Sequence, residues 1–173
     1  MTAPLSSTLA NFRLFIAGEK QLNLKFRKAT SQDIDLLKGL EQQVVQAERP
    51  FNSSIKSENA YYYDLESLLT DDQSYILVGE IEGRIIATGY VQIRSSKRSL
   101  NHDKHGYLGF MYVAPEHRGH GINQLLIDKL VQWSKQRLVN DFYLDVYDDN
   151  EAAIRAYKKL GFSKTLVEMK LNL

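Results

Sequence analysis

Two short stretches carry residue types and spacings that could do chemistry. The first reads Arg118-Gly119-His120-Gly121; it follows an apolar run at residues 107–113 and precedes apolar residues at helical spacing. A strand that turns through glycines into a helix aims several backbone N–H groups at one point, where the helix dipole favours negative charge. Glycines let the backbone approach a bulky anion because no Cβ intervenes. The stretch predicts a binding site for a phosphate or pyrophosphate group, although a tight strand-to-helix turn explains a glycine pair equally well.

The second stretch places Asn150 and Tyr157 seven positions apart, near one face of an expected helix. A phenol with a pKa of about 10 can give a proton to a departing thiolate, or hydrogen-bond to it. Spacing alone also fits a plainer interpretation. Tyr157 continues the apolar stripe of Ala153, Ile154 and Leu160, and Asn150 suits a helix N-cap.

Together the two stretches resemble the signatures of the GNAT family of N-acetyltransferases. Residues 118–123 resemble its acyl-coenzyme A signature, Arg/Gln-x-x-Gly-x-Gly/Ala, with Asn123 where the family usually has Gly or Ala. Residues 150–162 resemble its second signature, Asn-x-x-Ala-x-x-x-Tyr-x-x-x-Gly-Phe. The two occur in the family's order and at its usual separation, and the resemblance spans residues 22–173.

The resemblance implies acetyl-coenzyme A (acetyl-CoA) as co-substrate and a role for each matching residue. It implies that the pantetheine arm lies against a strand containing Met111, Tyr112 and Val113, and that Tyr157 is the general acid. The residues expected to contact the cofactor through the glycine turn and the second signature are Arg118, Gly119, His120, Gly121, Ile122, Asn123 and Asn150.

The general base is less evident, because residues 107–113 contain no acid where many family members carry a Glu. An amine with a pKa of about 10 must lose a proton before it attacks. Glu48, beside Pro50, is the expected base; His105, the weaker Glu41 and water-mediated deprotonation remain alternatives. Both Glu48 and His105 also fit plain surface residues.

Composition excludes several other kinds of site. The chain has no cysteine, which removes a cysteinyl acyl-enzyme and favours direct attack of the acceptor on the thioester. His117 and His120 are three residues apart but straddle a glycine turn and have no carboxylate at ligand spacing, so we expect no metal. His102 and His105 complete the set of histidines and add no ligand pattern.

Charge and hydropathy indicate a cytoplasmic protein that binds neither nucleic acid nor membrane. In 173 residues, 22 Lys and Arg balance 21 Asp and Glu, and no charge block stands out. No apolar run reaches membrane-spanning length, and the first residues lack the pattern of a signal peptide.

The order of the expected elements indicates an α/β or α+β fold with helices on both faces of a sheet. We expect a hairpin from residues 12–17 and 22–29, helices over residues 31–49, 60–69, 122–133 and 150–160, and strands at residues 75–81, 84–94, 107–113, 141–147 and 162–173. The resemblance implies a mixed, mostly antiparallel sheet of about six to seven strands with a splayed parallel pair. We expect residues 1–21 to be an N-terminal extension that can form part of the hairpin, and the resemblance implies that residues 22–173 are the N-acetyltransferase domain.

We therefore expect an N-acetyltransferase that moves an acetyl group from acetyl-CoA to a primary amine of a small molecule or peptide. The alternative is a non-catalytic acyl-CoA-binding regulatory domain with the same fold. A nucleotide-binding protein fits less well, because Ile122 and Asn123 follow the last glycine where a Lys-Ser/Thr pair is needed. The acceptor amine is not readable from the sequence, and the resemblance leaves a homodimer open.

Overall fold

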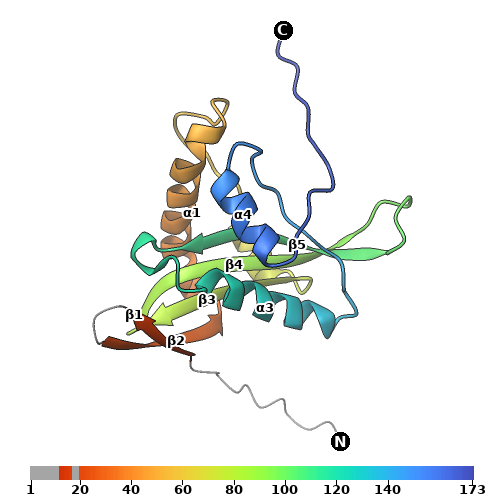
Figure 1. Ribbon diagram of the computed structural model, residues 1–173. Coiled ribbons are helices and arrows are strands. Elements are labelled where there is room, and N and C mark those ends of the chain that lie inside the picture. The colour runs from red at the N-terminus through yellow and green to blue at the C-terminus, as the bar shows by residue number, and fades with distance from the viewer. Residues whose placement is uncertain (1–11, 17–19) are drawn as a thin grey trace, which may run out of the picture.

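A single six-stranded sheet organises the chain, in the strand order β1-β2-β3-β4-β5-β6 (Figure 1). The computed structural model describes residues 12–16 and 20–173. The strands are β1 (Phe12–Ile16), β2 (Lys20–Lys28), β3 (Ser74–Ile81), β4 (Arg84–Ser95), β5 (Lys104–Val113) and β6 (Phe142–Tyr143). Neighbours are antiparallel except β5 and β6, which are parallel. This confirms the expected mixed, mostly antiparallel sheet.

Four α-helices pack around the sheet: α1 (Ile34–Glu48), α2 (Leu65–Thr70), α3 (Ile122–Lys135) and α4 (Glu151–Lys159). Helices α1 and α3 lie on opposite faces (Figure 1). Helix α3 buries Ile122, Leu126 and Leu130 at helical spacing, and Trp133 stacks on Tyr75 with ring centroids 5.2 Å apart. No helix in residues 20–173 has the length and apolar character needed to cross a membrane.

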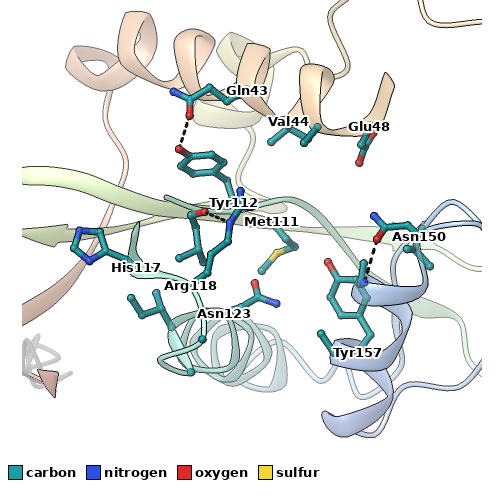
Figure 2. A pocket seen from close by; sticks show the side chains of 18 of the residues that line it. Gln43, Val44, Glu48, Met111, Tyr112, His117, Arg118, Asn123, Asn150 and Tyr157 are labelled. Carbon is teal, nitrogen blue, oxygen red and sulfur yellow. Dashed lines mark hydrogen bonds between the residues drawn. The ribbon is translucent and has the colours of Figure 1, made fainter. Parts of the chain in front are cut away.

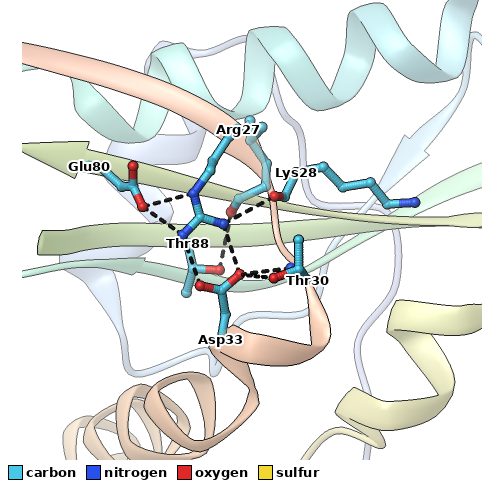
Figure 3. Close-up of polar contacts among 7 residues, drawn as sticks. Arg27, Lys28, Thr30, Asp33, Glu80 and Thr88 are labelled. Atoms are coloured by element: carbon cyan, nitrogen blue, oxygen red, sulfur yellow. Dashed lines mark hydrogen bonds and ion pairs between the residues drawn. The ribbon is translucent and has the colours of Figure 1, made fainter. Parts of the chain in front are cut away.

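The start of α1 is fixed to the sheet by an ion-pair cluster around Arg27 of β2 (Figure 3). The Arg27 guanidinium donates two hydrogen bonds of 2.8 Å to the Asp33 carboxylate and one of 2.8 Å to Glu80 on β3. The Thr30 N–H donates to Asp33 at 2.7 Å, which caps the turn that leads into α1. The helix that supplies one wall of the site is therefore tied to two strands.

Strand β5 carries a bulge opposite Gly89. Thr88 pairs with Tyr112 and Tyr90 pairs with Gly109, so Phe110 and Met111 together face one residue of β4. Phe110 has a φ of 55°, in the left-handed region that side chains other than glycine rarely adopt. Its N–H donates to the Tyr63 hydroxyl at 3.0 Å, and the two rings stack at 5.1 Å. Tyr63 therefore supports a locally strained backbone.

The parallel pair β5 and β6 diverges soon after it begins. The two strands pair only at Gly106 with Phe142 and at Tyr107 with Tyr143, and they separate beyond these residues. This confirms the splayed parallel pair expected between residues 107–113 and 141–147. The ladder is shorter than predicted, because within the described residues β6 has no strand on its other side.

Two further sequence predictions are wrong in detail. The helix expected over residues 60–69 begins only at Leu65, because the backbone N–H groups of Tyr62 and Tyr63 donate to the buried carboxylate of Glu41 at 2.6 and 2.9 Å. The strand expected over residues 162–173 does not form in the isolated chain. The hairpin prediction is confirmed by the pairing of β1 with β2, whereas residues 1–11 and 17–19 lie outside the described residues.

Candidate active site

A cavity of about 400 Å³ opens where β5 and β6 separate, between α1, the start of α3 and α4 (Figure 2). All but one of the twelve predicted site residues line it, from four separate parts of the chain. They are Glu48, Met111, Tyr112, Val113, Arg118, Gly119, Gly121, Ile122, Asn123, Asn150 and Tyr157.

The exception is His120. Its ring nitrogen Nδ1 lies 3.3 Å from the carbonyl oxygen of His117, and its side chain is not among those lining the cavity. Its neighbours in the loop, His117 and Gly121, both line the cavity, so the loop lies at the cavity although the His120 side chain does not. A hydrogen bond across the turn explains the difference.

The glycine turn leaves a group of backbone donors unpaired. Gly119 and Gly121 have φ values of 79° and 75°, and a Cβ at either position would meet nothing within 4 Å. Glycine is therefore required by the backbone conformation and not by crowding. Within the described residues, no backbone hydrogen bond is donated between Gly119 and Gln124; the first comes from Leu125 to the Gly121 carbonyl at 3.1 Å. Open N–H groups at a helix start attract anions.

Arg118 holds this turn against the end of β5. Its Nε donates to the Val113 carbonyl at 2.9 Å, and the residue is otherwise exposed at the cavity (Figure 2). The Tyr112 hydroxyl, one residue before, donates to Gln43 Oε1 of α1 at 2.6 Å. The cavity floor on β5 is thus tied to both the glycine turn and α1.

Tyr157 of α4 is partly buried and directs its ring toward the cavity (Figure 2). Phe162 packs edge-to-face against it, with ring centroids 5.8 Å apart. Burial, and to a lesser extent the negative charge of Glu48, raises the pKa of the Tyr157 phenol to about 12. The phenol therefore keeps its proton at neutral pH and can donate it.

Glu48 lies at the end of α1 and faces the same cavity (Figure 2). Burial raises the pKa of its carboxyl above the ordinary value, and the neighbouring Tyr62 hydroxyl offsets part of that effect. The Tyr62 hydroxyl itself is buried and makes no hydrogen bond of ordinary geometry within the described residues. A carboxylate of raised basicity, next to a cavity, can accept a proton from a bound amine.

Asn150 caps α4 and also faces the cavity. Its side-chain Oδ1 accepts a hydrogen bond of 3.1 Å from the Ala153 N–H, which makes it the N-cap of α4. The residue also lines the cavity. Capping fixes the first turn of α4 and, with it, the direction of the helix that carries Tyr157.

The other candidate bases lie elsewhere. The Glu41 carboxylate is buried under residues 62–63 and accepts hydrogen bonds from their backbone N–H groups. His105 contacts the Ser96 hydroxyl at 2.9 Å and packs against Tyr143, outside the cavity lining. In the described part of the chain no group of three or more His, Asp or Glu residues is placed to hold a metal ion.

Sequence reasoning missed part of the cavity wall. The residues concerned are Gln43, Val44 and Ala47 of α1, His117 before the glycine turn, Asp145 and Val146 after β6, and Ala153 and Ala156 of α4. Gln43 and Ala47 lie four apart, on the helical face that also presents Glu48. That spacing was visible, but the direction in which the face points depends on tertiary packing.

Comparison with known proteins agrees with this geometry. The model of the acetyltransferase (GNAT) family matches residues 41–162. Over 61 residues, 35% of the chain, the sequence is 39% identical to the uncharacterized N-acetyltransferase YobR of Bacillus subtilis. That match spans 25% of YobR, so the chain covers about a quarter of this relative's length.

Solved structures share the fold over most of the chain. A tetramutant of the BH1408 protein from Bacillus halodurans is 27% identical, with a TM-score of 0.75 over 86% of this chain and 99% of that one. A predicted acetyltransferase with acetyl-CoA from Clostridium acetobutylicum is 24% identical, with a TM-score of 0.69 over 86% and 96%. An aminoglycoside 6'-N-acetyltransferase from Acinetobacter haemolyticus is 19% identical, with a TM-score of 0.66 over 86% and 97%. The last two show likeness of fold alone. The match of the family model covers residues 41–162, which is more than half of the chain. The chain therefore belongs to the acetyltransferase (GNAT) family, whose enzymes are acetyl-CoA-dependent N-acetyltransferases.

Proposed function

We propose that this protein transfers the acetyl group of acetyl-CoA to a primary amine by direct attack of the amine on the thioester. The observation that carries the proposal is the composition of one cavity. Its wall combines the open N–H groups of the turn at Gly119 and Gly121 with two titratable groups, Glu48 and Tyr157, whose pKa values are raised. We also propose that residues 22–173 form the catalytic domain.

In this proposal the glycine turn binds the diphosphate of the cofactor. The N–H groups from Gly119 to Asn123 donate to the phosphate oxygens, and the Arg118 guanidinium adds charge at the rim. Asn123, which replaces the usual small residue, lines the cavity without closing it. The pantetheine arm then follows β5 from Val113 toward Met111, and Asn150 contacts it from the other side.

In this proposal the bulge in β5 supplies the hydrogen-bond donor for the thioester carbonyl oxygen. Phe110 and Met111 lie outside the regular ladder with β4, and the Phe110 N–H is already taken by Tyr63. Met111, the next residue, lines the cavity. We propose that its backbone N–H donates a hydrogen bond to the thioester carbonyl oxygen, on which negative charge develops during attack.

Proton transfer then divides between two side chains. Glu48 accepts a proton from the bound ammonium, and the free amine nitrogen forms a bond to the thioester carbon. As the carbon–sulfur bond breaks, Tyr157 gives its proton to the departing thiolate, and the acetylated nitrogen loses its remaining extra proton to water. The acetylated amine and coenzyme A leave, and both side chains return to their starting states by exchange with solvent.

The acceptor should be a cationic amine on a small molecule or peptide. Glu48 and Asp145 place two carboxylates on the cavity wall, which favours a positively charged group there. A like-folded protein from Acinetobacter haemolyticus is an aminoglycoside N-acetyltransferase, which supports amine-bearing small molecules as the first class to test.

The test is coenzyme A release with a panel of amines, measured for the wild type and for Tyr157→Phe. We expect the variant to lose about 100-fold or more in kcat while its affinity for acetyl-CoA stays within a few-fold, since the phenol acts on the leaving group. Tyr61→Phe, at an exposed tyrosine, is the matched control and should change neither value. Acetyl-CoA binding without turnover of any amine by the wild type would instead favour the non-catalytic acyl-CoA-binding domain.

A further inference from the structure

The hydroxyl of Tyr62 is a buried polar group without a partner. It is shielded from solvent, and among the described residues no group donates to it or accepts from it at ordinary hydrogen-bond geometry. Buried hydroxyl groups are nearly always satisfied, so one that is not calls for a physical reason. The proposed proton transfers use Glu48 and Tyr157, and neither transfer involves Tyr62.

The backbone of Tyr62 is held against the middle of α1. Its N–H donates to the Glu41 carboxylate at 2.6 Å, and the N–H of Tyr63 donates to the same oxygen at 2.9 Å. Glu41 and Glu48 are seven residues apart. This spacing puts them on one face of the helix, roughly 10 Å apart along its axis. A tyrosine anchored at Glu41 can therefore extend its hydroxyl along this face toward Glu48.

The hydroxyl of Tyr147 adjoins Tyr62, and its hydrogen-bond direction is fixed by Asn52. Asn52 Nδ2 donates to the Tyr147 oxygen at 3.1 Å, while Asn52 Oδ1 accepts the Ser54 N–H at 2.9 Å. Reversing the amide would set two donors against each other at Ser54. The Tyr147 oxygen is thus an acceptor, and its own proton is available for another oxygen. The Phe51 ring stacks on Tyr147, with centroids 6.5 Å apart, and holds the phenol in place.

These contacts set one direction of donation. Burial raises the pKa of the Tyr62 phenol most, and the adjoining Tyr147 hydroxyl and Glu48 carboxylate raise it further. Tyr62 therefore keeps its proton at neutral pH and can act as a donor. Donation runs from Asn52 to Tyr147, from Tyr147 to Tyr62 and from Tyr62 to Glu48, because an ionised carboxylate can only accept.

We propose that Tyr62 is a positioning residue for Glu48: its hydroxyl donates a hydrogen bond to the ionised carboxylate, with Tyr147 and Asn52 behind it. One carboxylate oxygen is then held by Tyr62, and the other faces the cavity to take the proton of the amine. The inference rests on the proposed role of Glu48 as the base. It explains how a carboxyl group whose ionised form is disfavoured by burial stays usable near neutral pH. In agreement with this, the Tyr62 hydroxyl lowers the pKa of Glu48 and offsets part of the effect of burial.

The cation next to Glu48 in the sequence does not take this role. The Arg49 guanidinium is directed to other groups, since it donates to Gln46 Oε1 at 3.1 Å and to the carbonyl oxygens of Ile55 and Ser57 at 3.4 and 3.1 Å. The titratable groups that face Glu48 or Tyr62 from other elements are Tyr63 before α2, Asp145 and Tyr147 after β6, and Tyr157 of α4. These groups are phenols and one carboxylate, so a phenol is the donor that the surroundings offer to the Glu48 carboxylate.

Titration of the Glu48 carboxyl tests the inference without any turnover. Its pKa is followed by NMR in protein labelled with carbon-13 at the glutamate carboxyl groups, and Glu48→Gln identifies the signal. We expect Tyr62→Phe to raise this pKa by about one pH unit or more, because a hydrogen bond to a charged group is lost. Tyr61→Phe, at an exposed phenol, is the matched control and should leave the pKa in place. An unchanged Glu48 pKa in Tyr62→Phe would overturn the inference, whatever the turnover shows.

The pH profile of kcat/KM should show the same change. In Tyr62→Phe we expect the acid limb to move upward by about one pH unit or more, while the plateau at higher pH stays within about threefold of the wild type. A merely structural role would lower the plateau and leave the limb in place, and that result would overturn the inference. If Glu48 is not the base, the acid limb instead persists in Glu48→Gln, although the carboxyl titration still reports on Tyr62.

A second variant tests the order of donation. Tyr147→Phe keeps the Tyr62 hydroxyl but removes the donor behind it, together with the acceptor of Asn52. We expect the Glu48 pKa to rise in this variant too, but by less than in Tyr62→Phe, since the direct hydrogen bond remains. A larger rise in Tyr147→Phe than in Tyr62→Phe would show that Tyr147 and not Tyr62 contacts the carboxylate, and would overturn the proposal.

Discussion

Burial sets the protonation of the two central side chains of the cavity. It raises the pKa of both Tyr157 and Glu48, with opposite consequences at neutral pH. The Tyr157 phenol, with its pKa at about 12, stays protonated through the physiological range and remains an acid. Glu48 loses its proton at a higher pH than an ordinary carboxyl group, so the carboxylate that forms is a stronger base.

The pH dependence of kcat/KM should therefore report Glu48. The raised pKa means that the base form is present above that pKa and disappears as the pH falls through it. We expect an acid limb above the ordinary Glu range in the wild type, and its loss together with about 100-fold of kcat/KM in Glu48→Gln. Glu58→Gln, on an exposed loop, is the control. An acid limb that persists in Glu48→Gln would exclude Glu48 as the base.

Several residues that line the cavity could be picked out from the sequence, because the two signatures are local. Residues 118–123 and 150–157 each lie on one turn or helix, so their spacing determines their geometry. Glu48 was less certain, since nothing near it in the sequence places the end of α1 across from Tyr157. The distinction between Glu41 and Glu48 depends on which face of α1 packs on residues 62–63.

At the scale of elements, the bulge in β5 is the feature that the sequence did not reveal. Phe110 is an ordinary strand residue by type, yet it has a φ of 55° because one residue of β4, Gly89, faces two residues of β5. The Tyr63 hydroxyl accepts the displaced N–H of Phe110. The tyrosine-rich segment that looked helical is therefore an extended support for β5.

We expect Tyr63→Phe to lower both stability and turnover. Removing the hydroxyl leaves the Phe110 N–H without a partner, which costs about 1–3 kcal/mol of unfolding free energy. It also loosens the position of Met111, so kcat should fall more than the affinity for acetyl-CoA. Denaturant unfolding and steady-state kinetics measure the two effects. Tyr62→Phe removes a buried hydroxyl with no hydrogen bond of ordinary geometry and should cost little stability; equal losses in both variants would contradict the support role.

At the scale of the whole molecule, the Arg27 cluster links β2, β3 and the start of α1. Within this cluster, the hydrogen bonds that Arg27 donates to Asp33 lower the pKa of Asp33 from 3.8 to about 2. A lowered pKa contributes stability that is fully present above about pH 4 and is lost as the pH falls toward 2. Because Arg27 is one-third exposed, we expect about 1–2 kcal/mol.

Acid unfolding of the wild type and of Asp33→Asn tests this contribution. The variant should be less stable at neutral pH, and its stability should change less between pH 5 and pH 2 than that of the wild type. Asp35→Asn, at the next acidic residue along α1, is the control and should follow the wild-type curve. Parallel curves for Asp33→Asn and the wild type would show that the ion pair does not set the acid limit.

The α+β class was predictable from the order of strands and helices, whereas the mostly antiparallel sheet of about six strands was what the family resemblance implied. The alternation in residues 162–173 predicted a final strand, and this prediction is wrong for the described structure. A strand needs a second strand to pair with, and within the described residues this segment has none.

The claim on which the account rests is that the N–H groups after Gly119 hold the diphosphate of acetyl-CoA. Calorimetric titration of acetyl-CoA into the wild type, Gly121→Glu and Gly161→Glu tests it most directly. Both glycines have positive φ, at 75° and 93°, so the two variants share backbone strain and added charge, but only Gly121 lines the cavity. We predict clear binding to the wild type and to Gly161→Glu, and at least about 100-fold weaker binding to Gly121→Glu. No heat with the wild type, or equal affinity in the two variants, would contradict the account.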